Sequence, residues 1–204
     1  MSAFAPLYET ATALVAATPA LRDFSPWPAS PAVQARTPVQ VPGVAHLLQT
    51  TWDVGSTLSP EHTRLHTALI DAIYATTEHA EWRRTYTEAE VGADFMARYG
   101  YYELLGPTGH FHSDTTRAYI GYWGPGLHYP WHEHRAEEIY YALAGGATFE
   151  VADDRYPKGV GESHTHASGE RHAMTTDPNG AGFLTLAVWR GAGLGENATM
   201  SSAA

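Results

Sequence analysis

The sequence of 204 residues contains no cysteine. Disulfide bonds, zinc–thiolate sites and thiol nucleophiles are therefore excluded, although this absence leaves the cellular compartment open. No apolar run approaches the roughly 18 residues that a membrane-spanning helix needs. The N-terminus lacks a basic stretch followed by a strongly apolar one, so no signal peptide is evident. We expect a soluble cytoplasmic protein.

Positive charge is also scarce. Lys and Arg number 12 against 22 Asp and Glu, which gives a formal net charge of −10. This balance argues against a surface that binds nucleic acid or an anionic membrane. The segment 59–105 has four arginines, eight acids and no lysine, which argues against a DNA-reading helix. The length suits one domain with a helical extension better than two separate cores.

Helix signals dominate the first half of the chain. Residues 2–17 are rich in alanine and predict a helix. A second helix is expected to begin at Ser59 and Pro60, because serine caps a helix and proline suits its first position. The sequence Thr-Glu-Ala-Glu at 87–90 matches a capping box. It predicts a third helix, which ends at Gly100.

Short runs rich in β-branched and aromatic residues follow after residue 106, and turn signals separate them. Such runs indicate an all-β sandwich or barrel. The runs cover residues 116–122, 138–143, 147–151 and 183–189. We therefore divide the chain into a helical region, 1–106, and a β-barrel, 107–204. The helical region is expected to pack on the barrel and its acidic part to cover or gate the barrel mouth.

The most informative window covers residues 126–145. Side chains two residues apart share one face of a β-strand. One regular strand, or a hairpin that keeps the alternation, would therefore project four residues together: His132, His134, Glu138 and Tyr140. A helix would separate the two histidines, because neighbours on a helix face are three or four residues apart.

A further histidine, His172, follows at a glycine-containing turn. Imidazole and carboxylate together suit a divalent transition metal. The alternative is that these are solvated histidines in a polar loop. We favour the metal because four potential ligands share one parity. The intervening residues Ile139, Tyr141 and Leu143 would then face a second apolar layer.

Two other histidine pairs receive no site role. His164 and His166 form another His-x-His pair but lack a set of partner ligands, so we assign them to a polar surface loop. A second metal site there is the less favoured interpretation. His110 and His112 also have no partner at a suitable spacing.

The window also matches a known signature. Gly126, His132, His134, Glu138 and Gly145 fit the first motif of the cupins, which are small antiparallel β-barrels. The resemblance implies a single cupin domain that follows the N-terminal helical region.

The second cupin motif is less complete. The segment 169–172 keeps its core, whereas Ala167 stands where a proline is usual and Thr176 where an asparagine is usual. These departures concern turn geometry and a supporting polar group, and they leave His172 in place.

A narrower resemblance is to the cupin-type dimethylsulfoniopropionate (DMSP) lyases, bacterial enzymes that split this osmolyte into acrylate and dimethyl sulfide. The stretch 129–140 resembles theirs, as do the helical first half and the 34-residue step from Glu138 to His172. The resemblance implies that His134, Glu138 and His172 are metal ligands.

The same resemblance assigns roles to three other residues. Tyr140 would be an additional, displaceable metal ligand and Tyr129 the catalytic base, with Tyr140 as the second candidate for that base. His132 would lie in the same pocket as a catalytic residue, with direct ligation of the metal as an open alternative. The expected cofactor is one divalent transition metal ion, Fe²⁺, Mn²⁺ or Zn²⁺.

The chemistry is consistent with these roles. A proton leaves the carbon beside a carboxylate, and a sulfonium group leaves the next carbon. A divalent cation bound to the carboxylate offsets the developing negative charge. Free tyrosine has a pKa of about 10, and a nearby cation favours its phenolate. Aromatic faces attract a sulfonium cation, and four aromatic residues are candidates: Tyr122, Trp123, Trp131 and Trp189.

Two alternatives stay open. The first is another metal cupin enzyme, such as an Fe(II) dioxygenase or a lyase that acts on a different small carboxylate. The second is a non-catalytic cupin that binds a small metabolite. Tyr129 and Tyr140 favour the DMSP lyase, because a dioxygenase does not need a phenolic base. In each case the expected partner is a small molecule, with no nucleic acid and no membrane.

Overall fold

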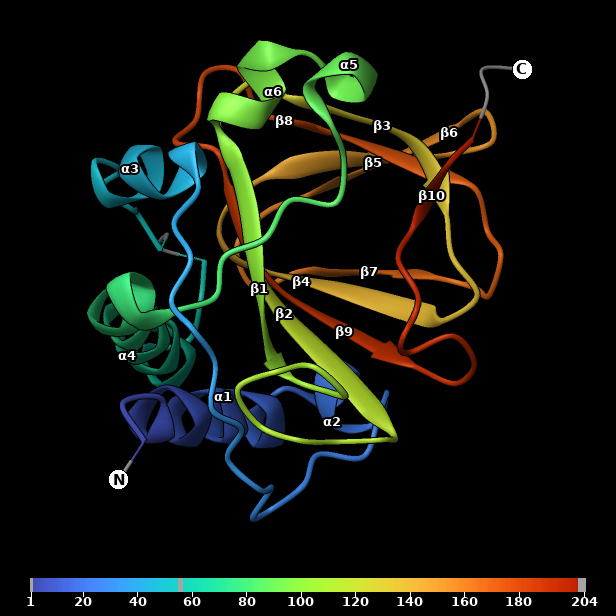
Figure 1. Cartoon of the computed structure of the whole chain (residues 1–204). Helices are drawn as coiled ribbons and strands as arrows, with labels where there is room; N and C mark the ends of the chain where they lie inside the picture. Colours follow the sequence, from blue (N-terminus) through green and yellow to red (C-terminus); the bar gives the residue numbers. More distant parts are fainter. Residues whose placement is uncertain (1, 55–56, 202–204) are drawn as a thin grey trace.

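Two antiparallel sheets form the centre of the structure, a computed structural model that describes residues 2–54 and 57–201 (Figure 1). Ten strands are described: β1 (Tyr99–Leu105), β2 (Thr116–Trp123), β3 (His128–Glu133), β4 (Glu137–Gly145), β5 (Ala147–Val151), β6 (Asp154–Lys158), β7 (Ser163–His166), β8 (His172–Thr176), β9 (Phe183–Arg190) and β10 (Thr199–Met200). One sheet has the order β1-β2-β9-β4-β7 and the other β10-β3-β8-β5-β6. The expected cupin barrel is confirmed.

The helices precede the barrel in the chain. They are α1 (Ala5–Ala17), α2 (Pro19–Arg22), α3 (Pro42–Leu48), α4 (Pro60–Thr76), a 3₁₀ turn (Thr77–His79), α5 (Glu88–Val91) and α6 (Ala93–Ala97). Figure 1 shows α1, α3 and α4 on one side of the barrel and α5 with α6 at one end. Each helix in the described part of the chain is too short or too polar to cross a membrane.

Local signals place the first two long helices correctly. The predicted helix at 2–17 is α1. The Ser59 hydroxyl accepts a hydrogen bond from the backbone N–H of His62 (3.2 Å) and caps α4, as expected. Its apolar side packs on α1 and on the outer face of β4. This helix therefore covers a sheet face and does not gate the barrel mouth.

The third predicted helix is wrong in its extent. The capping box at 87–90 is present, but α5 stops at Gly92, whose φ of 84° is unfavourable for other residues. A second short helix, α6, follows. The chain then enters β1 at Tyr99, inside the segment expected to be helical. Aromatic residues favour a strand there, and β1 pairs with β2 along its length.

The barrel strands agree with the predicted runs at four places. The runs 116–122, 147–151 and 183–189 correspond to β2, β5 and β9, and the run 138–143 lies inside β4. The last residue of β4, Gly145, has a φ of 72°, and a Cβ there would lie 1.9 Å from the carbonyl oxygen of Gly182. This close approach explains the glycine at the end of the motif.

The two faces of β4 belong to two different cores. Ile139, Tyr141 and Leu143 pack into the core that lies between the sheet and the helices. Tyr140 and Ala142 belong to the core inside the barrel. The predicted second apolar layer is thus confirmed, and the helical region supplies it.

His66 joins α4 to β4 and is fully buried. Its Nδ1 donates a hydrogen bond to the Leu143 carbonyl (2.8 Å), because a carbonyl can only accept. Nε2 then accepts from the Tyr141 hydroxyl (2.9 Å). Burial lowers the pKa of His66 below its usual value of 6.5. As pH falls through that value, the unfolded chain binds the proton first, so the folded state loses stability.

We expect His66→Leu to lower the free energy of unfolding at pH 7 by about 1–3 kcal/mol, because two buried polar groups lose their partner. Between pH 7 and pH 5 the variant should lose less further stability than the wild type. Urea unfolding followed by tryptophan fluorescence measures both effects. His79→Leu, at an exposed position, is the control, and parallel pH dependences of His66→Leu and wild type would contradict the expectation.

Candidate metal centre

Three predicted ligands meet at a corner of the barrel. His134 lies in the turn after β3, Glu138 lies on β4, and His172 is the first residue of β8. All three side chains are buried, and their ligand atoms lie within 4.8 Å of one another. Glu138 Oε2 is 2.9 Å from His134 Nε2 and 3.6 Å from His172 Nε2.

The hydrogen bonds around these imidazoles suit a metal ion. His134 Nδ1 donates to the carbonyl of Ala136 (2.9 Å), and His172 Nδ1 donates to the carbonyl of Glu170 (2.8 Å). With the proton on Nδ1, each ring can present the lone pair of Nε2 to a cation once Nε2 is deprotonated. Without an ion, burial by itself would lower the pKa of His134, but the charge of Glu138 and the hydrogen bond to it raise that pKa. His172 Nε2 is buried without a hydrogen-bond partner. Such an atom carries a desolvation cost that a bound cation would remove.

The carboxylate of Glu138 is held in its ionised form. Burial by itself would raise its pKa, but the charge and hydrogen bond of His134, together with the charge of the nearby His172, hold the pKa well below the usual value. Trp189 Nε1 donates to Glu138 Oε1 (2.6 Å). Because that oxygen is occupied, Oε2 is the one presented to the two imidazoles. The three residues therefore fit a divalent cation.

The motif forms neither the regular strand nor the hairpin that the sequence predicted. β3 ends at Glu133 in one sheet, and β4 begins at Glu137 in the other. His134 lies between them, where the chain crosses the corner. The register of β3 with β8 also shifts between Tyr129 and His132. In a regular strand, residues three apart such as Tyr129 and His132 would point to opposite faces. The irregularity lets both side chains lie inside the barrel.

His132 lies beside the ligand group and is not part of it. Its ring stacks on that of Tyr129 at 4.1 Å and lies 4.1 Å from the ring of His172. His132 Nδ1 donates to the carbonyl of Pro130 (2.7 Å). Burial lowers the pKa of His132 well below its usual value, and the neighbouring His172 adds to this. The ring is thus a neutral neighbour of both Tyr129 and the metal centre.

A cavity opens beside this group. Its walls are formed by Thr85, Tyr99, Tyr101, Tyr119, Gly121, Trp123, Tyr129, Glu138, Tyr140, Ala187, Trp189, Asn197 and Ala198. Glu138 connects the cavity to the candidate metal centre, and Tyr129 and Tyr140 both line it. Burial raises the pKa of each of these two tyrosines well above its usual value.

Two of the four expected aromatic residues, Trp123 and Trp189, line the cavity, and the other two do not. Tyr122 is the strand neighbour of Trp123 and faces the helices, where its hydroxyl contacts His46 and Thr50. Trp131 lies on β3 away from the cavity, and the Arg171 guanidinium is 5.1 Å from its ring. Side chains of adjacent residues on a strand point to opposite faces, so Tyr122 points away from the face that Trp123 occupies. The assignments of Tyr122 and Trp131 to the sulfonium contact are therefore corrected.

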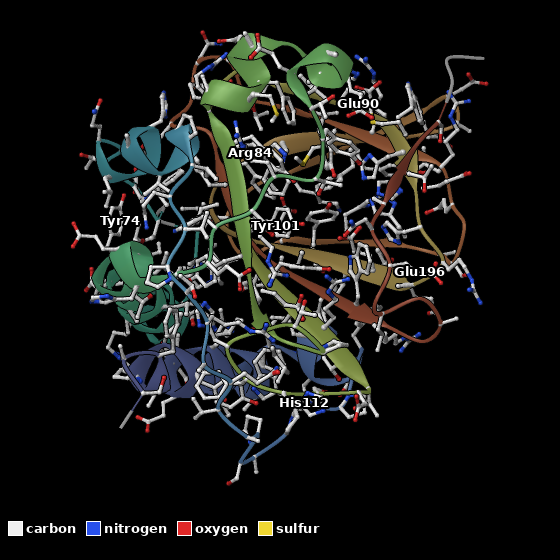
Figure 2. All side chains as sticks on the ribbon, viewed as in Figure 1. Tyr74, Arg84, Glu90, Tyr101, His112 and Glu196 are labelled. Carbon is white, nitrogen blue, oxygen red and sulfur yellow. The ribbon has the colours of Figure 1, made fainter. Side chains whose placement is uncertain are left out.

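Three tyrosines of the cavity wall were missed. Tyr119 has the same parity as Trp123 on β2, a signal that could have revealed it. Tyr99 and Tyr101 lie on β1, which the sequence had assigned to the helical region. Tyr101 is labelled on β1 in Figure 2. Once β1 is known to be a strand, alternation puts both residues on the same face.

The surface-loop assignment is wrong for both His164 and His166, which lie on β7, and His166 is only 1% exposed. Its ring stacks on His172 at 3.7 Å. His164 is less buried and packs between Phe149 and Tyr156. His110, which received no site role, is buried against Phe4, away from the metal centre.

The C-terminal segment 194–201 closes one side of the cavity with Asn197 and Ala198. Glu196 of this segment is labelled in Figure 2. Arg117 donates hydrogen bonds to the carbonyls of Leu194 (2.7 Å) and Glu196 (2.8 Å). The Arg117 guanidinium is itself paired with the buried carboxylate of Glu103 (2.9 Å). A buried ion pair thus anchors this wall.

Comparison with known proteins decides the family. The family described as dimethylsulfoniopropionate lyase matches residues 22–181, well over half of the chain. Dimethylsulfoniopropionate lyase DddQ of Ruegeria pomeroyi is 40% identical over 191 residues, which cover 93% of this chain and 90% of that protein. This chain belongs to the DMSP lyase family.

Solved structures of DMSP lyases share its fold. A crystal structure reported for the DMSP lyases RdDddP and RnDddQII has a TM-score of 0.89 and 39% identity, with 98% of both chains covered. The crystal structure of DddQ from Ruegeria pomeroyi DSS-3 has a TM-score of 0.87 and 37% identity. It covers 98% of this chain and 96% of that one. The barrel and the helical region of this DMSP lyase family member are thus both family features.

We expect His134→Ala, Glu138→Ala and His172→Ala each to lose bound metal, because each removes one of three buried ligands. Elemental analysis of the purified proteins measures the metal content. His128→Ala, which removes an exposed histidine of β3, is the matched control and should keep its metal. Full metal retention in all three ligand variants would show that the centre lies elsewhere.

Proposed function

We propose that this protein is a metal-dependent DMSP lyase, which cleaves dimethylsulfoniopropionate to acrylate and dimethyl sulfide by β-elimination. One observation carries the proposal: Tyr129, Tyr140 and the ligand Glu138 line a single aromatic cavity. Membership of the DMSP lyase family supports the same reaction.

The proposed cofactor is one divalent transition metal ion, Fe²⁺, Mn²⁺ or Zn²⁺. His134, Glu138 and His172 would hold it, and Tyr140 would be a displaceable fourth ligand. When bound, the ion supplies a Lewis acid for the substrate carboxylate and a positive charge that favours the phenolate of a nearby tyrosine.

The charges of the cavity wall fit a zwitterionic substrate. Among the described residues that line the cavity there is no lysine or arginine, so the protein itself offers no cation for the substrate carboxylate. The opposite end of the substrate is a sulfonium cation, which aromatic faces attract. Five aromatic wall residues are available for this contact: Tyr99, Tyr101, Tyr119, Trp123 and Trp189.

Tyr129 is the proposed base. Its ring is held by the stack on His132, and its hydroxyl lies 3.2 Å from that of Tyr86. As phenolate, Tyr129 takes the proton from the carbon beside the substrate carboxylate. The electron pair of that C–H bond forms the double bond of acrylate, the C–S bond breaks, and dimethyl sulfide leaves with the bonding pair.

The alternatives are less consistent with this cavity. A dioxygenase does not need two phenols beside its ligands, and a non-catalytic binder does not need a base. A lyase for another small carboxylate would use the same groups, so the substrate requires a direct test. The reaction needs only a small-molecule partner. The cytoplasmic location stays a prediction from the sequence.

We expect the purified protein, loaded with Fe(II), Mn(II) or Zn(II), to release dimethyl sulfide from DMSP. Headspace gas chromatography measures the product, and the metal-free protein is the control. Other β-substituted carboxylates, assayed in parallel with the same metals, test the substrate class. No dimethyl sulfide above the metal-free level, with any of the three ions, would refute the proposed activity.

Tyr129→Phe should retain bound metal but lose turnover by about 10²–10⁴-fold, because it removes the general base and little volume. The control is Tyr156→Phe, which removes an exposed phenol on β6 and should leave turnover unchanged. Headspace analysis and elemental analysis on the same samples separate catalysis from metal binding. Unchanged turnover in Tyr129→Phe would move the base to another group, with Tyr140 the next to test.

A further inference from the structure

His166 contacts the metal centre from a strand that the motif does not include. It lies on β7, directly opposite Glu138 of β4 in the antiparallel register. Its ring stacks on that of His172 with 3.7 Å between ring centroids and 10° between ring planes. Only 1% of His166 is exposed, and its Nε2 has no hydrogen-bond partner.

The ring geometry excludes His166 as a ligand of the same ion. An imidazole lone pair lies in the plane of its ring, so two ligand rings must be inclined for their lone pairs to converge. The rings of His134 and His172 are inclined by 77°, as convergence requires. The rings of His166 and His172 are almost parallel, so their lone pairs point along separate planes. His166 therefore contacts His172 through its face.

Glu170 connects the two stacked rings. Its carboxylate oxygen Oε2 lies 3.2 Å from His166 Nδ1 and also accepts from the backbone N–H of Ala167 (3.3 Å). The main-chain carbonyl of Glu170 accepts from His172 Nδ1 (2.8 Å). One residue thus holds His166 with its side chain and His172 with its backbone, and the relative placement of the rings is fixed.

We propose that His166, held by Glu170, is a positioning residue that sets the ring orientation of the metal ligand His172. The hydrogen bond to Nδ1 fixes one edge of the His172 ring, but it leaves the ring free to tilt about that edge. Stacking against the face of the ring removes this freedom. The inference rests on the proposed metal centre, and it adds a residue from β7 that does not touch the ion.

Supporting contacts of this kind change metal affinity by about 10–100-fold when they are removed. We therefore expect His166→Ala to weaken metal binding by about that factor. The readouts are competition with a chromophoric chelator and the visible absorption bands of the Co(II)-loaded protein, which report ligand geometry independently of turnover. The bands of His166→Ala should shift relative to wild type.

Two further variants separate stacking from other effects. His166→Phe retains a flat ring and should recover most of the affinity and the wild-type Co(II) bands. Glu170→Gln keeps the backbone carbonyl that holds His172 but weakens the bond to His166, so an intermediate loss is expected. His128→Ala, an exposed histidine on β3, is the control for loss of an imidazole. Circular dichroism verifies that each variant is folded.

The outcomes distinguish this inference from the proposed function. A wild-type protein that binds no metal would refute the proposed metal centre. A wild type that binds metal, together with His166→Ala at wild-type affinity and with unchanged Co(II) bands, would overturn the positioning role. Affinity as weak in His166→Phe as in His166→Ala would overturn the stacking explanation. If His166→Ala does not fold, wild-type affinity in both His166→Phe and Glu170→Gln overturns the inference, whereas loss in Glu170→Gln alone supports it.

Discussion

The carboxylate of Glu138 is buried where the two sheets meet, and a buried charge is costly unless it is paired and hydrogen-bonded. Its partners come from three different parts of the barrel: Trp189 on β9, His134 at the corner and His172 on β8. The strands must therefore converge at this point for the carboxylate to be tolerated. The same convergence brings three ligand atoms to within 4.8 Å of one another. A metal ion bound there would add a positive charge beside the buried carboxylate of Glu138.

The helical region packs against the outer face of β4, the strand that carries Glu138. β4 carries Glu138 and Tyr140 toward the cavity and Ile139 and Tyr141 toward the helices, so packing on one face holds the strand that supplies the other. His66 of α4 adds hydrogen bonds to the backbone and a side chain of β4. Within the acidic region 59–105, the cavity is lined by Thr85, Tyr99 and Tyr101, whereas α4 packs on α1 and on β4.

Much of the site could be predicted from the sequence. The family resemblance implied His134, Glu138 and His172 as metal ligands, and the fold does bring these three residues together. The alanine-rich segment located α1, the capping signal at Ser59 located α4, and runs of β-branched and aromatic residues located β2, β5 and β9. The cavity wall was harder. Tyr122 and Trp131 were assigned to it because aromatic faces attract a sulfonium cation, but neighbouring side chains on a strand point to opposite faces.

The sequence by itself determined the donor types, the parity of β4 and the family to which the motif belongs. These features are local, because they depend on alternation and on the chemistry of side chains a few residues apart. Only the tertiary structure decided that Tyr99 and Tyr101 reach the cavity and that His166 stacks on His172. Those contacts depend on which strands are neighbours in the barrel, and the spacing of nearby residues does not determine that. Strand pairing joins residues that are far apart in the chain and places His166 of β7 opposite Glu138 of β4, so a histidine that had been assigned to a surface loop lies beside the candidate metal centre.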